Sequence, residues 1–243
     1  MKSTKGFKSA GTLIAVAVLV LAVAATGLWA KQSKPAPAKA PAAKKADGDV
    51  IAMKNISINK KTKEIRISVK TALQKGILEY LLVGDKGKAY ESAFKVADNL
   101  PSELYFALTL IGCEPLPYDA FMKLLESPKG KEEIQKGHAA SLLSIELLKG
   151  GKPAPLASVV RDREKGAGEL IFVFTGGRFI KQSAYSADQE RSFIGLWPDL
   201  SAVVNLFSTH KNPYRGDYGY EMNTAAKGLA ADQDYELVIR RKS

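Results

Sequence analysis

Residues 76–115, GILEYLLVGDKGKAYESAFKVADNLPSELYFALTLIGCEP, contain the densest apolar run of the chain outside its N-terminus. Their first part, residues 77–83, is rich in branched and aromatic side chains, which suit a largely buried strand. Residues 84–87 have turn chemistry, because Asp forms local hydrogen bonds and Gly accepts positive φ. Residues 89–96 then alternate apolar and polar side chains, so we expect a β-hairpin.

A helix is predicted to follow this hairpin. Pro101 suits the first helical position, where its missing N–H would have no partner, and Glu103 suits the positive end of the helix dipole. Gly112 is a natural C-terminal cap for the same helix. Apolar side chains recur at helical spacing at Leu104, Ala107, Leu108 and Ile111. We expect the helix to lie across the hairpin and to close one core.

The rest of the sequence after residue 49 predicts more strands than helices. Strands are predicted at 56–58, 64–69, 141–148, 169–175, 192–196 and 234–240. Short helices are predicted at 118–126, 127–137, 156–160 and 198–205. The apolar residues of the run 141–148 fit both the spacing of a helix and the alternation of a strand. We assign the run to a strand because a Gly-Gly turn follows it. Strands joined mostly by short turns predict an α+β domain with a mainly antiparallel sheet and a few short helices.

Residues 1–30 have the pattern of an export signal. Three lysines precede an uncharged run at 11–30. As a helix, residues 12–30 would span about 28 Å, which is close to the thickness of a bilayer core. This segment therefore predicts a contact between the chain and a membrane.

The sequence leaves open whether this segment is a cleaved signal peptide or a signal anchor. Residues 22–24, Ala-Val-Ala, match a small-residue cleavage site. The apolar run is longer than a usual signal core, and Trp29 with Lys31 would suit the membrane interface, so we favour the anchor. Both alternatives export the domain, and the anchor would hold it on the periplasmic side of the inner membrane.

Residues 31–49, KQSKPAPAKAPAAKKADGD, are predicted to be a disordered linker rich in Pro, Ala and Lys. At about 3.1 Å per residue, such a chain reaches roughly 50–60 Å. Residues 1–49 carry eight Lys and two Asp, which supply +6 of the formal net charge of +11. The predicted single domain at 50–243 is therefore only mildly basic, with 28 basic and 23 acidic residues. This composition does not favour nucleic acid as a partner.

A set of motifs runs through the predicted domain. G-x-L-E-Y-L-L-V, G-K-x-Y-E-S and P-S-x-L-x-x-A-L-x-L-I-G occur within residues 76–112, and segments at 174–179, 185–188 and 199–205 agree with them. Together they resemble the YdjY-like domain family of bacterial extracytoplasmic proteins, from about residue 50 to the C-terminus. The resemblance implies a compartment and a domain, but no established activity. Some relatives are described as iron–sulfur proteins, and this chain lacks the cysteines for that role.

The motifs of common catalytic classes are missing from the sequence. It has no G-x-S-x-G elbow, no phosphate-binding glycine loop, and only as many S-x-x-K matches as chance gives. Cys113 is the single cysteine, which excludes an internal disulfide and a multi-cysteine metal site. His138 and His210 have no partner at metal-motif spacing, so we expect surface or capping roles for them. We therefore expect no metal site and no cofactor.

Paired carboxylates are the one catalytic arrangement that the sequence offers. Glu79 and Glu91 lie on the two arms of the predicted hairpin. A two-residue turn would point them to opposite faces, whereas a three-residue turn would make them diagonal neighbours that could share a proton. Asp188 is a third weak candidate. We expect structural roles for the pair, with hydrogen bonds to the backbone or to Arg.

Two regions are candidate binding sites. Arg178 follows a Gly-Gly pair, and it could form an ion pair with Asp188 or hold an anion. Residues 208–219 read as an exposed polar loop, and exposed Tyr and Arg are efficient interface residues. The candidate contact residues of this region are Tyr214, Arg215, Tyr218 and Tyr220.

The sequence therefore predicts a membrane-tethered extracytoplasmic protein that acts as a binding or accessory module of the cell envelope. An envelope protein is the expected partner, and the membrane is contacted through residues 12–30. The alternative is an envelope hydrolase that uses the carboxylates of Glu79, Glu91 and Asp188. A deep cleft that unites these carboxylates would favour the hydrolase, and a flat face lined with Tyr would favour the module.

Overall fold

The computed structural model describes residues 48–164, 169–180, 184–210, 212–216, 218–224 and 232–242, and the backbone of Lys44 and Lys45. From Lys44 onwards the described residues belong to one compact unit. The predicted signal or anchor at 1–30 and most of the predicted linker lie outside the described residues. Within the described ranges, none of the helices has the length and apolar character needed to cross a membrane.

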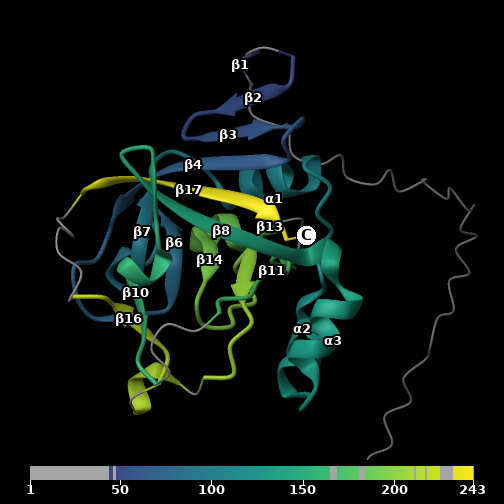
Figure 1. The fold of residues 1–243 in the computed structure, drawn as a ribbon, viewed down its shortest axis with the longest axis vertical. Coiled ribbons are helices and arrows are strands. Elements are labelled where there is room, and N and C mark those ends of the chain that lie inside the picture. The colour runs from purple at the N-terminus through teal and green to yellow at the C-terminus, as the bar shows by residue number, and fades with distance from the viewer. Residues whose placement is uncertain are drawn as a thin grey trace, which may run out of the picture. The chain divides into compact units, whose positions relative to one another are not determined.

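Eight of the described strands form a closed ring of hydrogen-bonded neighbours (Figure 1). In ring order they are β4 (Glu64–Thr71), β17 (Asp234–Arg241), β8 (Leu142–Lys149), β11 (Phe172–Phe174), β15 (Val204–Leu206), β14 (Ser192–Gly195), β6 (Tyr80–Gly84) and β7 (Ser92–Val96). The ring closes where β7 pairs with β4, with Phe94 opposite Thr71. Only β14–β15 and β6–β7 are parallel neighbours in this ring, which confirms the predicted mainly antiparallel sheet.

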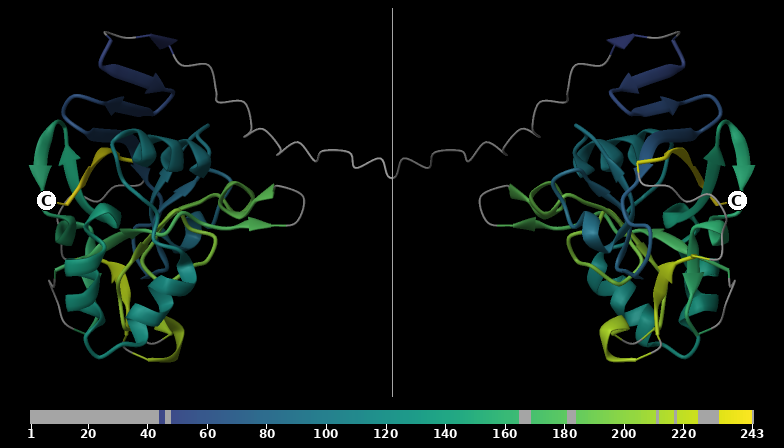
Figure 2. Two further views of the ribbon diagram at one scale, coloured as in Figure 1. Left: turned by 90° about the vertical axis from the view of Figure 1, so that its right-hand side faces the viewer. Right: turned by 90° about the vertical axis from the view of Figure 1, so that its left-hand side faces the viewer.

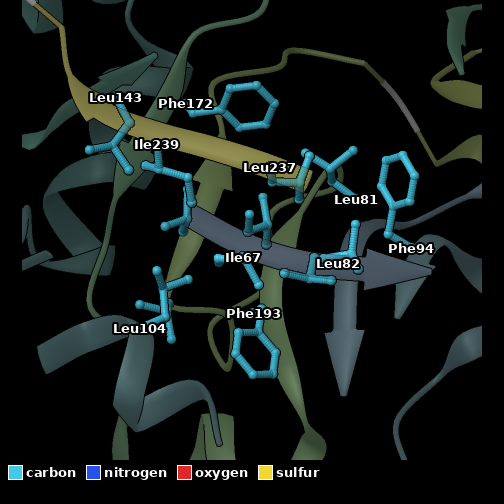
Figure 3. Packing of buried hydrophobic residues seen from close by; sticks show 14 of the residues in the cluster. Ile67, Leu81, Leu82, Phe94, Leu104, Leu143, Phe172, Phe193, Leu237 and Ile239 are labelled. Atoms are coloured by element: carbon cyan, nitrogen blue, oxygen red, sulfur yellow. The ribbon is translucent and has the colours of Figure 1, made fainter. Parts of the chain in front are cut away.

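The register of the ring places apolar side chains next to one another on its inner face. Ile67 of β4 lies opposite Leu237 of β17, which lies opposite Leu147 of β8. The inward row continues through the other strands with Phe172, Leu206, Ile194, Leu82 and Phe94. Each of these side chains is at most 2 % exposed, and Figure 3 shows several of them in contact. The ring is therefore a barrel with a packed interior.

The outer face of β4, β17 and β8 carries charged residues that alternate with the inward row. Glu64 pairs with Arg66 at 2.5 Å and with Arg240 at 2.6 Å. Arg66 also contacts Glu236 at 2.7 Å, and Arg240 contacts Glu146 at 2.9 Å. This alternation explains why strands 64–69 and 234–240 could be predicted from their sequences.

The remaining strands extend or flank the barrel. β1 (Lys44–Lys45), β2 (Val50–Met53) and β3 (Ile56–Asn59) continue the sheet beyond β4, and β9 (Lys152–Ala154) pairs with β8. A second sheet consists of β10 (Val160–Asp162), β16 (Tyr220–Met222) and β5 (Ile77–Leu78). A third consists of β12 (Phe179–Ile180) and β13 (Ala184–Tyr185), and it projects from the barrel as a narrow arm (Figure 2).

Four short helices complete the described fold: α1 (Pro101–Leu110), α2 (Tyr118–Glu126), α3 (Gly130–Gly137) and α4 (Ser186–Glu190). α1 begins and ends as predicted, since Glu103 Oε2 accepts the Leu100 N–H at 2.9 Å and Gly112 has φ +84°. Leu104 and its neighbours on α1 share one buried cluster with the barrel interior. α2 and α3 instead cover Val173 in a second cluster. The predicted helices at 118–126 and 127–137 are therefore confirmed.

The predicted hairpin is wrong in its direction, because β6 and β7 are parallel. Tyr80 lies opposite Ser92 and Gly84 lies opposite Val96. Between them the chain turns after Gly84 and returns through the 3-10 turn η1 (Ala89–Glu91) to the start of β6. The other edge of β7 is paired antiparallel with β4, so closure of the barrel fixes the direction of β7.

The predicted helix at 198–205 is also wrong, because Val204–Leu206 forms β15. This strand fills the space between β11 and β14, where its side chains are buried on both faces. The Asn205 amide donates to Thr175 Oγ1 at 2.8 Å and to the Asp199 carbonyl at 2.9 Å, which satisfies it inside the core. The strand predicted at 141–148 is confirmed by β8. The helical turn predicted at 156–160 is present as η3 (Leu156–Ser158), but it ends before Val160, which begins β10.

Candidate binding surface

Glu79 and Glu91 lie side by side in the structure. The Glu79 N–H donates to the Glu91 carbonyl at 2.9 Å, where β6 and β7 begin their parallel pairing. Burial and the charge of Glu91 raise the pKa of the Glu79 carboxyl, which is also hydrogen-bonded to the Glu91 side chain. The ammonium of Lys88 opposes this shift. The two carboxyl groups can therefore share a proton, although the hairpin register that was expected to bring them together does not exist.

Tyr214 completes this pair from a distant part of the sequence. Its hydroxyl donates to Glu91 Oε1 at 2.8 Å across 123 positions. Burial and this hydrogen bond raise the pKa of the Tyr214 phenol. The Tyr214 side chain is still 52 % exposed, and the neighbouring Tyr90 is 67 % exposed. Glu79, Tyr90, Glu91 and Tyr214 together form what we call the carboxylate–tyrosine surface.

The loop that carries Tyr214 is held in place by Arg163. One guanidinium nitrogen, Nη1, donates to the carbonyls of Pro213, Gly216 and Tyr218 at 2.9–3.0 Å. The turn η5 (Pro213–Arg215) is also capped, because Asn212 Oδ1 accepts the Tyr214 N–H at 2.9 Å. The position of the Tyr214 ring is therefore set by the fold before any partner binds.

A further acidic residue, Asp199, lies close to the carboxylate–tyrosine surface. Tyr80 donates to Asp199 Oδ2 at 2.9 Å, and burial followed by this charge raises the pKa of the Tyr80 phenol. The Asp199 charge also contributes to the raised pKa of Glu79. The Lys88 ammonium lies 5.6 Å from the centre of the Tyr80 ring. An ammonium group thus already lies among these carboxylates and aromatic rings.

The structure separates Asp188 from the other candidate carboxylates. Asp188 Oδ1 accepts the N–H of Ser102 at 2.8 Å, so it joins α4 to the first turn of α1. Arg178 is exposed, and in the described part of the chain it forms no ion pair with Asp188. The predicted ion pair of Arg178 and Asp188 is therefore wrong.

The predicted contact residues of the loop have different environments. Tyr214 and Arg215 are exposed, as expected. Tyr218 is partly buried, and its carbonyl is one of the acceptors of Arg163. Tyr220 is only 6 % exposed and belongs to the main core cluster, so its predicted role as a surface contact is wrong.

The surface or capping role predicted for His210 is wrong, because its imidazole is almost completely buried between two carboxylates. Its Nε2 is 2.9 Å from Asp162 Oδ2, and its Nδ1 is 2.9 Å from Glu164 Oε2. The imidazole is only 5 % exposed and meets the Tyr220 ring edge to face at 5.2 Å. Since each ring nitrogen faces a carboxylate, none is left to activate the nearby Ser208 or to bind a metal. Among the described residues, no group of His, Cys, Asp and Glu side chains could hold a metal ion.

Two clefts open elsewhere on the fold. One of about 460 Å³ lies between Lys70, Lys95, Asp234 and Glu236, with Tyr235 in its wall. The other, of about 310 Å³, is mostly apolar and has Asp162 and Tyr220 in its lining. Neither is lined by a residue of the carboxylate–tyrosine surface.

Comparisons of the chain with protein-family models, with curated proteins and with solved structures found no match. The likeness to YdjY-like domains thus stays a prediction from the motifs alone.

Proposed function

We propose that this protein is an extracytoplasmic binding module that is tethered to the inner membrane through residues 12–30. It binds an envelope protein through its carboxylate–tyrosine surface. One observation carries this proposal: the exposed ring of Tyr214 is fixed over Glu91 by the bond from its own hydroxyl. Exposed tyrosines that are held rigidly bind partners at low entropic cost. The motifs that resemble YdjY-like domains support the same compartment.

The chemistry of the surface favours a cationic group on the partner. Carboxylates of Glu79 and Glu91 attract a positive charge, and the faces of Tyr90 and Tyr214 can cover it. Lys88 shows that an ammonium fits among these groups, since it already lies beside Glu79 and the Tyr80 ring. A Lys or Arg side chain of an envelope protein has the required form.

Site-specific photocrosslinking in membranes tests this proposal. A photoreactive amino acid at position 214 should trap a partner, whereas the same group at Thr62, in the exposed turn between β3 and β4, should not. Glu91→Gln should weaken the trapping at 214, because it removes the charge and leaves the size of the side chain. Equal patterns at 214 and at 62 would exclude the carboxylate–tyrosine surface as the contact site.

Fractionation of cells and the intact mass of the purified chain test the tether. An uncleaved chain in the membrane fraction is the expected result. A shorter, soluble chain would mean that residues 1–30 are a cleaved signal peptide, and a full-length chain in the cytosol would exclude export.

An envelope hydrolase remains the second candidate, and one observation favours it. Burial and Glu91 raise the pKa of Glu79, which is how proteins keep a carboxylic acid protonated beside a carboxylate for acid–base chemistry. Asp188 has no part in this version, because it is bound to the backbone of α1. Turnover of an envelope substrate that is lost in both Glu79→Gln and Glu91→Gln but retained in Tyr214→Phe would favour the hydrolase.

A further inference from the structure

The arm formed by β12 and β13 has a fixed base. Gly176 and Gly177 have φ of +83° and +64°, and the Gly176 carbonyl accepts the Tyr185 hydroxyl at 2.7 Å. A Cβ at Gly177 would lie 2.9 Å from the Tyr185 hydroxyl oxygen, so this close approach needs a glycine. The direction in which the arm leaves the barrel is therefore determined by the fold (Figure 2).

A series of packed aromatic rings connects the arm to the core. Phe174 of β11 meets Tyr105 of α1 edge to face at 5.1 Å, and Tyr105 meets Tyr185 at 6.1 Å. The Tyr185 ring in turn contacts Phe179, with the ring centres 5.1 Å apart. Contacts of this kind favour one position of the outermost ring. Phe179 is therefore held in position by packing, although most of its side chain faces solvent.

The outer part of the described arm exposes apolar side chains next to a cation. Phe179 is 68 % exposed and Ile180 is 41 % exposed, whereas the barrel residues of similar size are buried. Arg178, the residue before them, is also exposed and forms no ion pair in the part of the chain that the structure describes. A fixed arm with a Phe, an Ile and an exposed guanidinium has the composition of a segment that lies at a membrane interface.

We propose that this arm docks on an anionic lipid surface, with Phe179 and Ile180 in the interfacial region and Arg178 among the headgroup phosphates. The inference rests on the proposed tether, which keeps the domain within reach of the bilayer. If the linker at 31–49 is extended, its reach of roughly 50–60 Å allows the arm to meet the same membrane that holds residues 12–30.

A lipid surface fits the arm better than a second protein does. Two apolar side chains are too few to form the core of a stable protein interface, which buries about 1,200–2,000 Å². A tethered domain needs only weak additional binding, because its local concentration at the membrane is already high. The charge of the arm agrees as well, since the exposed guanidinium of Arg178 lies beside its apolar side chains and is attracted by anionic headgroups.

An environment-sensitive fluorophore at position 179 tests the inference in the full-length chain. Phe179→Cys and Tyr90→Cys are labelled through their thiols and reconstituted into vesicles of phosphatidylcholine, with or without phosphatidylglycerol. The two positions are matched, because Phe179 is 68 % and Tyr90 is 67 % exposed. Cys113 should stay unlabelled, since burial raises the pKa of its thiol to about 11.

The expected result is a blue-shifted emission at 179 that nitroxide-labelled lipids quench, more strongly in vesicles with phosphatidylglycerol, and neither effect at 90. Arg178→Gln should reduce the dependence on anionic lipid, and Ile180→Ser should reduce the quenching at 179. If the label at 179 stays in an aqueous environment while the protein floats with the vesicles, the arm does not dock on the membrane. The proposed tether is not affected by that result. Quenching at both positions, or quenching at 179 only after an envelope extract is added, would overturn the docking of the arm too. A chain that does not float would refute the tether, and with it both proposals.

Discussion

Glu79 is the residue whose ionisation should change the stability of the fold with pH. Its pKa in the folded state is raised above the usual value of a glutamate, first by burial and second by the charge of Glu91. Between the unfolded and the folded pKa the native state binds more protons than the unfolded state, so stability falls as pH rises through that window. Unfolding by urea, followed from below pH 4.5 to pH 7, should show Glu79→Gln gaining stability relative to the wild type as pH rises.

Glu64 is the control for this prediction, because its pKa moves the other way. Burial acts to raise the pKa of Glu64, but the hydrogen bonds and charges of Arg66 and Arg240 outweigh it, and the pKa is lowered. The stability from Glu64 is therefore present above its unfolded pKa and is lost as pH falls. Glu64→Gln should lose stability at pH 7 relative to the wild type. The same pH profile in both variants would contradict the assignment for Glu79.

The contacts of His210 with Asp162 and Glu164 give a second prediction at the scale of single residues. His210→Leu removes one hydrogen-bonding partner of Asp162, whose side chain is only 7 % exposed and keeps the Glu164 N–H as a donor at 2.9 Å. We expect the loss of this buried hydrogen bond to lower the free energy of unfolding by about 1–3 kcal/mol, measured by urea unfolding at pH 7. Lys136→Ala breaks an exposed pair with Glu132 and should cost about 0.3–0.5 kcal/mol. If His210→Leu lowers the free energy of unfolding by no more than this control does, the contacts of His210 have no structural role.

At the scale of elements, the connection from α2 to α3 depends on Gly130. A Cβ at this position would lie 1.7 Å from the Leu124 carbonyl oxygen and 2.7 Å from its carbon, and these backbone atoms cannot rotate away. Gly130→Ala should therefore destabilise the fold by about 2 kcal/mol or more, as measured by thermal and urea unfolding.

The last residue of α3, Gly137, supplies a matched control, because a Cβ there would have no atom within 4 Å beyond its chain neighbours and the backbone of its own helix. Gly137→Ala should leave the stability unchanged or raise it by up to about 1 kcal/mol through helix propensity. If both substitutions have equal effects, the close approach of α2 to α3 cannot be the reason that Gly130 is needed.

The elements were predictable where their sequence patterns are local, and not where distant segments decide them. α1 follows from Pro101, its apolar stripe and Gly112. The direction of β7 does not follow from its own residues, because β4 sets it by closing the barrel. The candidate sites were not predictable for the same reason, because their residues are far apart in the sequence. Tyr214 contacts Glu91 across 123 positions, and His210 contacts Asp162 across 48. Arg163, which positions the Tyr214 loop, had no motif that could reveal it.

At the scale of the whole molecule, closure of the barrel should make its strands open together. β17 is paired with β4 along one edge and with β8 along the other, whereas β2 lies outside the ring. Native-state hydrogen exchange should find that β17 amides exchange only through global unfolding, and that β2 amides exchange through a smaller, local opening. Leu237→Ala, at a fully buried position of β17, should lower the global free energy of unfolding by about 3 kcal/mol and speed exchange in β17 and β8. Exchange in β2 should be unchanged in that variant, and equal acceleration in β2 and β17 would mean that the ring and its extension unfold as one unit.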